Sequence, residues 1–273
     1  MKSCEATIII PTTGNRGELL RYSVASVINQ TVRDFEILIV GDGVSDESKE
    51  VIAELRRKDS RIFFHDFPKH ERRGEPYRHQ VIKESRGKHI FYLCDRDLML
   101  PRHLEIVTGY LRDYNFISSV CIEVRRDRNL NLQHSTGFFG PGSEVEVGNK
   151  SADVPLSCVG HTREMYNRLE FGWRTTPVNE LTDHYMWKQF MAHPECKIFA
   201  SPKPAILWFS RGAHPGDPVE VRAKELAFWS EIMSTPQGID NIWWSALSRL
   251  LLERNSLKQF KHSVMKDHLA KTS

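Results

Sequence analysis

The sequence has no long apolar run, no charge excess of one sign and no signal peptide, and each absence removes a class of protein. No stretch approaches the roughly 18 apolar residues that a membrane-spanning helix needs. Its 38 Lys and Arg residues against 35 Asp and Glu give a net charge of +3, without the basic excess of a dedicated nucleic-acid-binding protein. The start, MKSCEATIII, lacks the apolar core and cleavage site of a signal peptide. We therefore expect a cytoplasmic protein with no nucleic-acid partner.

Two further absences concern cofactors. The five cysteines are widely spaced and form no CxxC pair, which fits reduced thiols better than a disulfide framework or a zinc site. No GxGxxG motif follows the first apolar run, so a nicotinamide-dependent dehydrogenase is disfavoured. The absence of a glycine-rich P-loop excludes a P-loop enzyme on the same ground.

Residues 89–101, HIFYLCDRDLMLP, combine an apolar run with two carboxylates, Asp95 and Asp97. The run predicts a strand covered on both faces, with the aspartates at its carboxyl end, where open α/β sheets bind ligands. Carboxylates separated by one residue can converge on Mg²⁺ or Mn²⁺. A solvated acidic turn before a helix that starts at Pro101 explains the same residues without a metal. Both interpretations stay open from this segment alone.

Apolar runs alternate with helical stripes along the chain, which predicts an α/β fold with a parallel sheet. The expected strands are 7–10, 36–40, 61–65, 89–94, 118–124 and 205–210, and the expected helices include 16–29, 101–112, 164–169 and 181–190. The first strand is expected to end at position 10 or 11, and the second to run into a tight turn over 41–46. Ser45 or Asp46 is expected to cap the next helix, and Thr182 or Asp183 a later one.

Two segments depart from this alternation. Residues 69–88 are the most basic stretch and lead directly into the aspartate strand, so they form either a solvated helix face or a cationic site for an anionic ligand. Residues 125–150 are polar and rich in glycine, which predicts a long insertion or hairpin.

The order of these segments resembles family two glycosyltransferases of the GT-A fold. The resemblance lies in ATIIIPTTGNR, SVINQTVRDFEILIVGDGVSD, GEPYRHQ, FYLCDRDLMLP and LTDHYMW, densest over residues 6–110 and thinner to about 217. It implies a Rossmann-like, mostly parallel sheet flanked by helices, with a nucleotide-sugar-binding half at 1–124 and an acceptor and catalytic half at 125–217. It also implies metal-dependent transfer, with inversion, from a nucleotide sugar, most often a UDP-sugar. Glycan or lipid-linked acceptors of bacterial-type polysaccharide or glycoconjugate synthesis would be the partners. A GT-A domain that binds a nucleotide or glycan without turnover is the alternative.

The resemblance assigns roles to particular residues. The implied donor-binding residues are Pro11, Thr12, Thr13, Arg16, Asp42, Arg78, Asp95, Arg211 and His214. Among them, the Pro11–Thr12 turn and Asp42 match positions that hold the base and ribose, and Arg78 matches a basic position near the base or diphosphate. Arg211 and His214 match a mobile loop that closes over the donor. Asp183 matches the catalytic base.

The metal motif of the family matches Asp95 and Asp97, with Asp97 as the direct ligand of a Mn²⁺ or Mg²⁺ ion that bridges the diphosphate oxygens. The sequence departs from the family pattern at Gly41, His79, Cys94, Arg96 and Thr182, and two of these departures bear on how the donor and metal are bound. Gly41 stands where an aspartate is usual, so base recognition passes to Asp42 or changes. Arg96 stands between the two metal-motif aspartates, where it could lower metal affinity by repulsion or pair with the diphosphate.

Residues 218–273 show no family motif and are expected to form a helical extension. Its apolar stripe consists of Ile239, Ile242, Trp243, Ala246, Leu247, Leu250 and Leu251. We expect this stripe to pack on the domain or on a second subunit of a homo-oligomer. The basic tail past Arg254 (Lys258, Lys261, His262, Lys266 and Lys271) is expected to give weak, salt-sensitive contact with the inner face of an anionic membrane.

Overall fold

The computed structural model describes the backbone of residues 3–133, 144–145 and 154–272, and the side chains of 3–133 and 154–260. The elements are β1 (Cys4–Gly14), α1 (Gly17–Ile28), β2 (Phe35–Val44), α2 (Asp46–Lys58), β3 (Ile62–Phe67), α3 (Glu75–Glu84), β4 (Gly87–Tyr92), β5 (Leu98–Met99), α4 (His103–Tyr110), β6 (Phe116–Val124), β7 (Leu130–Gln133), β8 (Glu144–Val145), a 3₁₀ turn (Leu156–Cys158), β9 (Val159–Thr162), α5 (Arg163–Arg168), α6 (Thr182–Ala192), β10 (Ile198–Trp208), α7 (Val219–Met233) and α8 (Pro236–Thr272).

The described strands form one curled sheet in the order β3-β2-β1-β4-β9-β6-β10-β5, with β7 paired to β6 and β8 to β10. Strands β3, β2, β1 and β4 are parallel neighbours, and β6 is parallel to β10. Strand β9 lies antiparallel between β4 and β6, so these two flanking strands point the same way. The predicted mostly parallel α/β sheet is confirmed.

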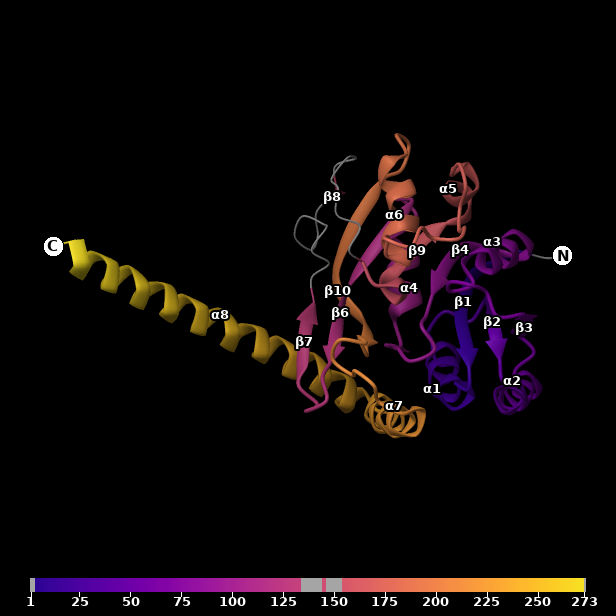
Figure 1. The fold of residues 1–273 in the computed structure, drawn as a ribbon, viewed down its shortest axis with the longest axis horizontal. Coiled ribbons are helices and arrows are strands. Elements are labelled where there is room, and N and C mark those ends of the chain that lie inside the picture. The colour runs from indigo at the N-terminus through magenta and orange to yellow at the C-terminus, as the bar shows by residue number, and fades with distance from the viewer. Residues whose placement is uncertain (1–2, 134–143, 146–153, 273) are drawn as a thin grey trace.

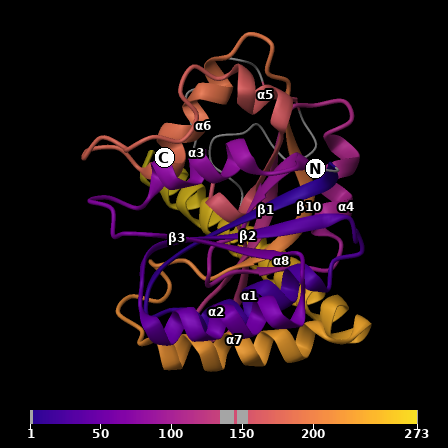
Figure 2. The same ribbon diagram turned by 90° about the vertical axis from the view of Figure 1, so that its right-hand side faces the viewer.

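Helices cover both faces of this sheet. Figure 2 shows α1, α2 and α7 under one face and α3, α5 and α6 over the other. The strands are therefore buried on both sides, and Ile8, Ile9 and Ile10 of β1 are all fully buried. A continuous apolar run is the sequence signature of such a doubly covered strand.

Both N-terminal strands extend beyond their expected ends. Strand β1 continues through Pro11, which lies opposite Val40, because β2 runs parallel beside it as far as Gly14, although the pairing with β4 ends at Ile9. Strand β2 runs to Val44, so the tight turn expected over 41–46 is wrong. Gly43 meets the local twist with a φ of +65°, which glycine adopts without strain. These extensions carry the first polar residues of both loops to the sheet edge.

The two helix-cap expectations have different outcomes. Ser45 caps α2 as expected, because its hydroxyl accepts a hydrogen bond from the Ser48 backbone N–H. Helix α6 begins at Thr182 with Leu181 as its N-cap residue, and no side chain caps it. The expected capping role of Thr182 or Asp183 is therefore wrong, which leaves the Asp183 carboxylate available for another role.

The first turns of α8 pack on the domain, and the rest of the helix projects into solvent. Ile242 and Ala246 of α8 are buried in a second apolar core with Phe209 and Trp229, whereas Trp244 and Leu251 are exposed. Figure 1 shows α8 crossing β7 and projecting away. The expected packing on the domain holds for the first turns of the stripe. The tail side chains from Lys261 onward lie outside the described residues, and no helix in the described part has the length and apolarity to cross a bilayer.

Candidate active site

A cavity of about 720 Å³ opens at the carboxyl edge of the sheet. Residues from the ends of β1, β2, β4, β6 and β10 line it, together with the segment before α3 and the start of α6. The lining residues are Pro11, Thr12, Thr13, Arg16, Val40, Asp42, Lys69, Arg72, Arg73, Gly74, Arg78, Cys94, Asp95, Arg96, Glu123, Leu156, Thr182, Asp183, Trp208, Ser210, Arg211 and Gly212. The sequence assigned nine residues to donor binding and Asp183 to the catalytic base. All of these ten residues except His214 line the cavity.

The end of β1 meets the end of β4 through Asp95. The Oδ2 atom of Asp95 accepts a hydrogen bond from the Thr12 hydroxyl at 3.0 Å and lies 3.4 Å from the Arg16 guanidinium. Asp95 itself is almost fully buried. Thr12 near the end of β1 and Arg16 just after it therefore compensate the charge of Asp95, and all three residues line the cavity.

Asp42, at the end of β2, is tied to the basic segment. Its Oδ1 atom accepts from the His70 backbone N–H at 2.6 Å, and its Oδ2 atom pairs with the Lys69 ammonium. The preceding residue has to be glycine here, because a Cβ on Gly41 would approach the Val44 and Phe64 side chains within 3.0 Å. The Phe64 side chain thus occupies the space that the aspartate expected at position 41 would need.

The basic stretch forms part of the cavity wall. Arg78 of α3 is buried, its guanidinium lies 4.7 Å from the centre of the Trp173 ring, and Nη2 donates to the Arg73 carbonyl oxygen. Its Nε and Nη1 atoms are buried and have no hydrogen-bond partner. Because a buried unpaired donor costs about 1–3 kcal/mol, Arg78 is suited to an anionic ligand. Of the two interpretations of residues 69–88, this geometry favours the cationic site.

Asp183 lines the same cavity from the first turn of α6. Burial raises the pKa of its carboxyl, although the Arg78 and Arg73 guanidinium groups act in the other direction. A carboxylate with a raised pKa is a better proton acceptor than an ordinary aspartate. The cavity therefore holds a carboxylate suited to accept a proton, within electrostatic reach of Arg78 and Arg73.

The two aspartates of the predicted metal motif do not face the same space. Asp95 lines the cavity, but Asp97 is fully buried and does not: its Oδ2 accepts from the Ser157 hydroxyl at 2.5 Å and its Oδ1 from the Phe209 N–H at 3.0 Å. Burial raises the pKa of the Asp97 carboxyl. Among the described side chains, no three of His, Cys, Asp or Glu converge on one point. The residues present therefore do not fit the divalent cation that the sequence suggests.

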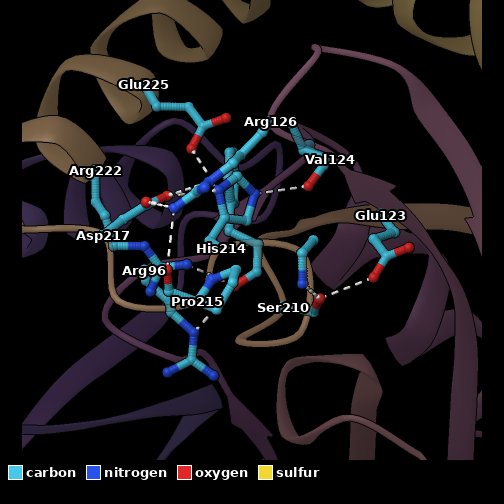
Figure 3. Close-up of polar contacts among 12 residues, drawn as sticks. Arg96, Glu123, Val124, Arg126, Ser210, His214, Pro215, Asp217, Arg222 and Glu225 are labelled. Atoms are coloured by element: carbon cyan, nitrogen blue, oxygen red, sulfur yellow. Dashed lines mark hydrogen bonds and ion pairs between the residues drawn. The ribbon is translucent and has the colours of Figure 1, made fainter.

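The loop after β10 contributes Arg211 but not His214. His214 is buried, its Nε2 lies 2.8 Å from the Val124 carbonyl oxygen, and its Nδ1 is 3.3 Å from carboxylate oxygens of both Asp217 and Glu225 (Figure 3). These contacts anchor the loop to β6 and α7. In this structure His214 holds the loop and does not reach the cavity.

Several lining residues were not among the expected site residues. Glu123 and Ser210 join the ends of β6 and β10 through a 2.8 Å hydrogen bond. Ser157, in the 3₁₀ turn before β9, is not a lining residue but holds Asp97 in place. The positions of these three residues depend on the pairing of β6 with β9 and β10, which are distant in sequence. No local sequence motif indicates that pairing.

The whole arrangement is that of a GT-A glycosyltransferase: a mostly parallel sheet with a charged cavity at its carboxyl edge. The chain belongs to glycosyl transferase family 2, whose model matches residues 7–187.

Curated relatives agree with this family. The Campylobacter jejuni GalNAc(5)-diNAcBac-PP-undecaprenol beta-1,3-glucosyltransferase is 25% identical over 140 residues, 51% of this chain and 45% of the relative. The Staphylococcus aureus poly(ribitol-phosphate) beta-N-acetylglucosaminyltransferase TarP is 28% identical over 113 residues, 41% of this chain and 34% of the relative. In each case the match spans less than half of the relative.

Among solved structures, residues 1–349 of S. aureus TarS in complex with UDP-GlcNAc share the fold. The TM-score is 0.62 at 14% identity, over 90% of this chain and 72% of that one.

Proposed function

We propose that this protein transfers a sugar from a nucleoside diphosphate sugar to an acceptor hydroxyl, with inversion at the anomeric carbon. The observation that carries the proposal is the presence, in one cavity, of several arginines and the Asp183 carboxylate. Inverting transfer needs both parts on opposite sides of the sugar. One neutralises the leaving diphosphate and the other accepts the proton of the attacking hydroxyl.

The bonding changes follow from this arrangement. The acceptor oxygen forms a bond to the anomeric carbon while the bond from that carbon to the diphosphate oxygen breaks. The leaving diphosphate keeps the electron pair, and the hydroxyl proton passes to Asp183. Base catalysis of this kind contributes about 10²–10⁴-fold to a rate.

The donor side of the cavity supports a nucleotide. Pro11, Thr12 and Asp42 lie at adjacent strand ends, where α/β sheets hold nucleotides, and the unpaired Arg78 donors suit phosphate oxygens. TarS binds UDP-GlcNAc with the same fold, which supports a UDP-sugar as the first donor to test. The names of the two relatives specify an undecaprenyl diphosphate-linked glycan and a poly(ribitol phosphate), which support a glycan or lipid-linked acceptor.

A cytoplasmic location, with the basic tail on the inner membrane face, stays a prediction. Co-sedimentation with anionic liposomes at low and high salt tests it: salt-sensitive binding that requires residues 255–273 is expected.

A thermal-shift panel of UDP-, GDP- and dTDP-sugars tests donor binding. We expect at least one nucleotide sugar to raise the melting temperature of the wild-type protein. We expect Arg78→Gln to lose most of that shift, while exposed Arg57→Gln keeps it. A panel without any stabilising donor, in EDTA and in Mn²⁺ alike, contradicts the proposal.

A further inference from the structure

We propose that Arg96 supplies the positive charge that neutralises the leaving diphosphate, in place of a divalent cation. The proposal rests on the proposed function and concerns how the donor is held. It begins from the disagreement between the expected metal motif and the geometry of its two aspartates.

The first observation is the direction of the three side chains in the segment 95–97. Asp95 and Arg96 line the cavity, whereas Asp97 is turned into the protein and both of its oxygens are occupied. The oxygen of Asp95 that is bound by Thr12 also lies against Arg16. Of the two aspartates of the motif, only Asp95 could reach a cation in the cavity, and that cation would lie beside the Arg96 and Arg16 guanidinium groups. Mutual repulsion disfavours that arrangement.

The second observation is that Arg96 is fixed in place. Its Nε donates to the Phe209 carbonyl oxygen at 3.1 Å, and Arg222 of α7 donates to the same oxygen at 3.2 Å. The Phe209 N–H is in turn held by Asp97. Figure 3 shows the Arg96 guanidinium extending past this anchor, away from α7 and the His214 cluster. A guanidinium held through Nε leaves its two terminal nitrogens for phosphate oxygens, which it can bind in a bidentate manner.

The third observation is the local excess of positive charge. Arg73, Arg96 and Arg211 share the cavity with Arg16. Partial burial and the nearby Arg96, Arg73 and Arg16 lower the pKa of Arg211, which places these guanidinium groups within electrostatic reach of one another. Like charges gathered in this way are stabilised when an anion lies between them. The negative charge of a diphosphate would compensate these guanidinium groups.

These observations give Asp97 a role different from metal binding. It is a positioning residue, because it fixes Phe209, which fixes Arg96. As the anomeric carbon to oxygen bond breaks, negative charge grows on the leaving diphosphate. Arg96 and Arg211 stabilise it without a change in their own bonding.

Calorimetric titration with UDP and GDP, in EDTA and then in Mn²⁺, tests the proposal on the wild-type chain. We expect the better nucleotide to bind with affinities within about 3-fold of each other in the two buffers. We expect Arg96→Gln to weaken binding about 10- to 100-fold in both buffers, as the loss of a hydrogen bond to a charged group predicts. Uridine or guanosine, which lack phosphate, should bind both proteins equally.

The controls distinguish failure of the Arg96 proposal from failure of the transferase proposal. Arg57→Gln, on the exposed face of α2, should bind like the wild type. Binding that requires Mn²⁺ in the wild type overturns the role of Arg96 but leaves the transferase proposal intact. Absence of nucleotide binding in both buffers overturns the transferase proposal itself. The wild-type result decides the question even if Arg96→Gln fails to fold.

Discussion

Arg96 and Asp97, adjacent in the chain, hold opposite ends of the same residue. Arg96 donates to the carbonyl oxygen of Phe209 at 3.1 Å, and Asp97 accepts from its N–H at 3.0 Å. Phe209 directly follows β10, so this clamp joins the end of β4 to the end of a strand more than a hundred residues later. One side chain of the pair then lines the cavity and the other supports it.

The clamp predicts different effects for two substitutions of Asp97. Asp97→Asn keeps an oxygen for the Phe209 N–H, so nucleotide affinity should stay within about 3-fold of wild type. Asp97→Ala leaves that buried N–H unpaired and should lower the free energy of unfolding by about 1–3 kcal/mol. Urea denaturation and calorimetry measure the two effects. Complete loss of nucleotide binding in a folded Asp97→Asn variant would restore Asp97 as a direct metal ligand.

Asp183→Asn should separate chemistry from donor binding. The carboxylate acts on the acceptor hydroxyl, so the rate of transfer should fall about 10²–10⁴-fold while donor affinity stays near wild type. Steady-state kinetics and calorimetry give the two values. If affinity and rate fall together by the same factor, Asp183 belongs to the donor pocket and the base lies elsewhere.

The pH dependence of kcat should show an acidic limb from Asp183. The base works as the carboxylate, so the rate falls as pH drops through its pKa. Because burial raises that pKa above the ordinary aspartate value, the limb should lie above pH 3.8. Folding has to be checked at each pH. A kcat that stays flat through the acidic range in which the protein remains folded contradicts the assignment.

Stability should fall with acid because of two buried histidines. Burial lowers the pKa of both His103 and His161 to about 3, so each stays neutral in the fold and takes up a proton on unfolding. Their contribution is fully present above the unfolded pKa near 6.5 and is lost as pH falls toward 3. Between pH 6.5 and 5 the loss is about 2 kcal/mol per histidine.

His103→Leu provides the control for this effect. Neither ring nitrogen of His103 has a hydrogen-bond partner, so leucine removes the titration without removing a bond. The variant should show a shallower decline of unfolding free energy with acid, by about one proton's slope. An unchanged slope would assign the acid sensitivity to other groups.

The sequence predicts the parts of this molecule that depend on local pattern. The apolar run before Asp95, the stripe of α1 and the Ser45 cap are each encoded in neighbouring residues, and all three hold. The direction of Asp97 could not be predicted, because it depends on Ser157 and Phe209, which reach it through distant strand pairings. The spacing of two aspartates gives their order but not which face of a loop each takes.

His214 illustrates the same limit. A histidine in a loop after a late strand fits a ligand-binding role, yet its environment is set by Val124, Asp217 and Glu225. Only the packing of α7 against that loop reveals the anchor. The roles of the C-terminal helix in a second subunit and of the division at residue 217 remain predictions.

The stereochemistry of the first product decides whether the protein is an inverting transferase. Proton NMR of the anomeric signal can be recorded early in the turnover of an α-linked UDP-sugar, with Asp183→Asn as the inactive reference. We expect the wild type to release UDP and to form a β-configured sugar product. An α-configured first product, or no release of nucleoside diphosphate from any UDP-, GDP- or dTDP-sugar, would contradict it.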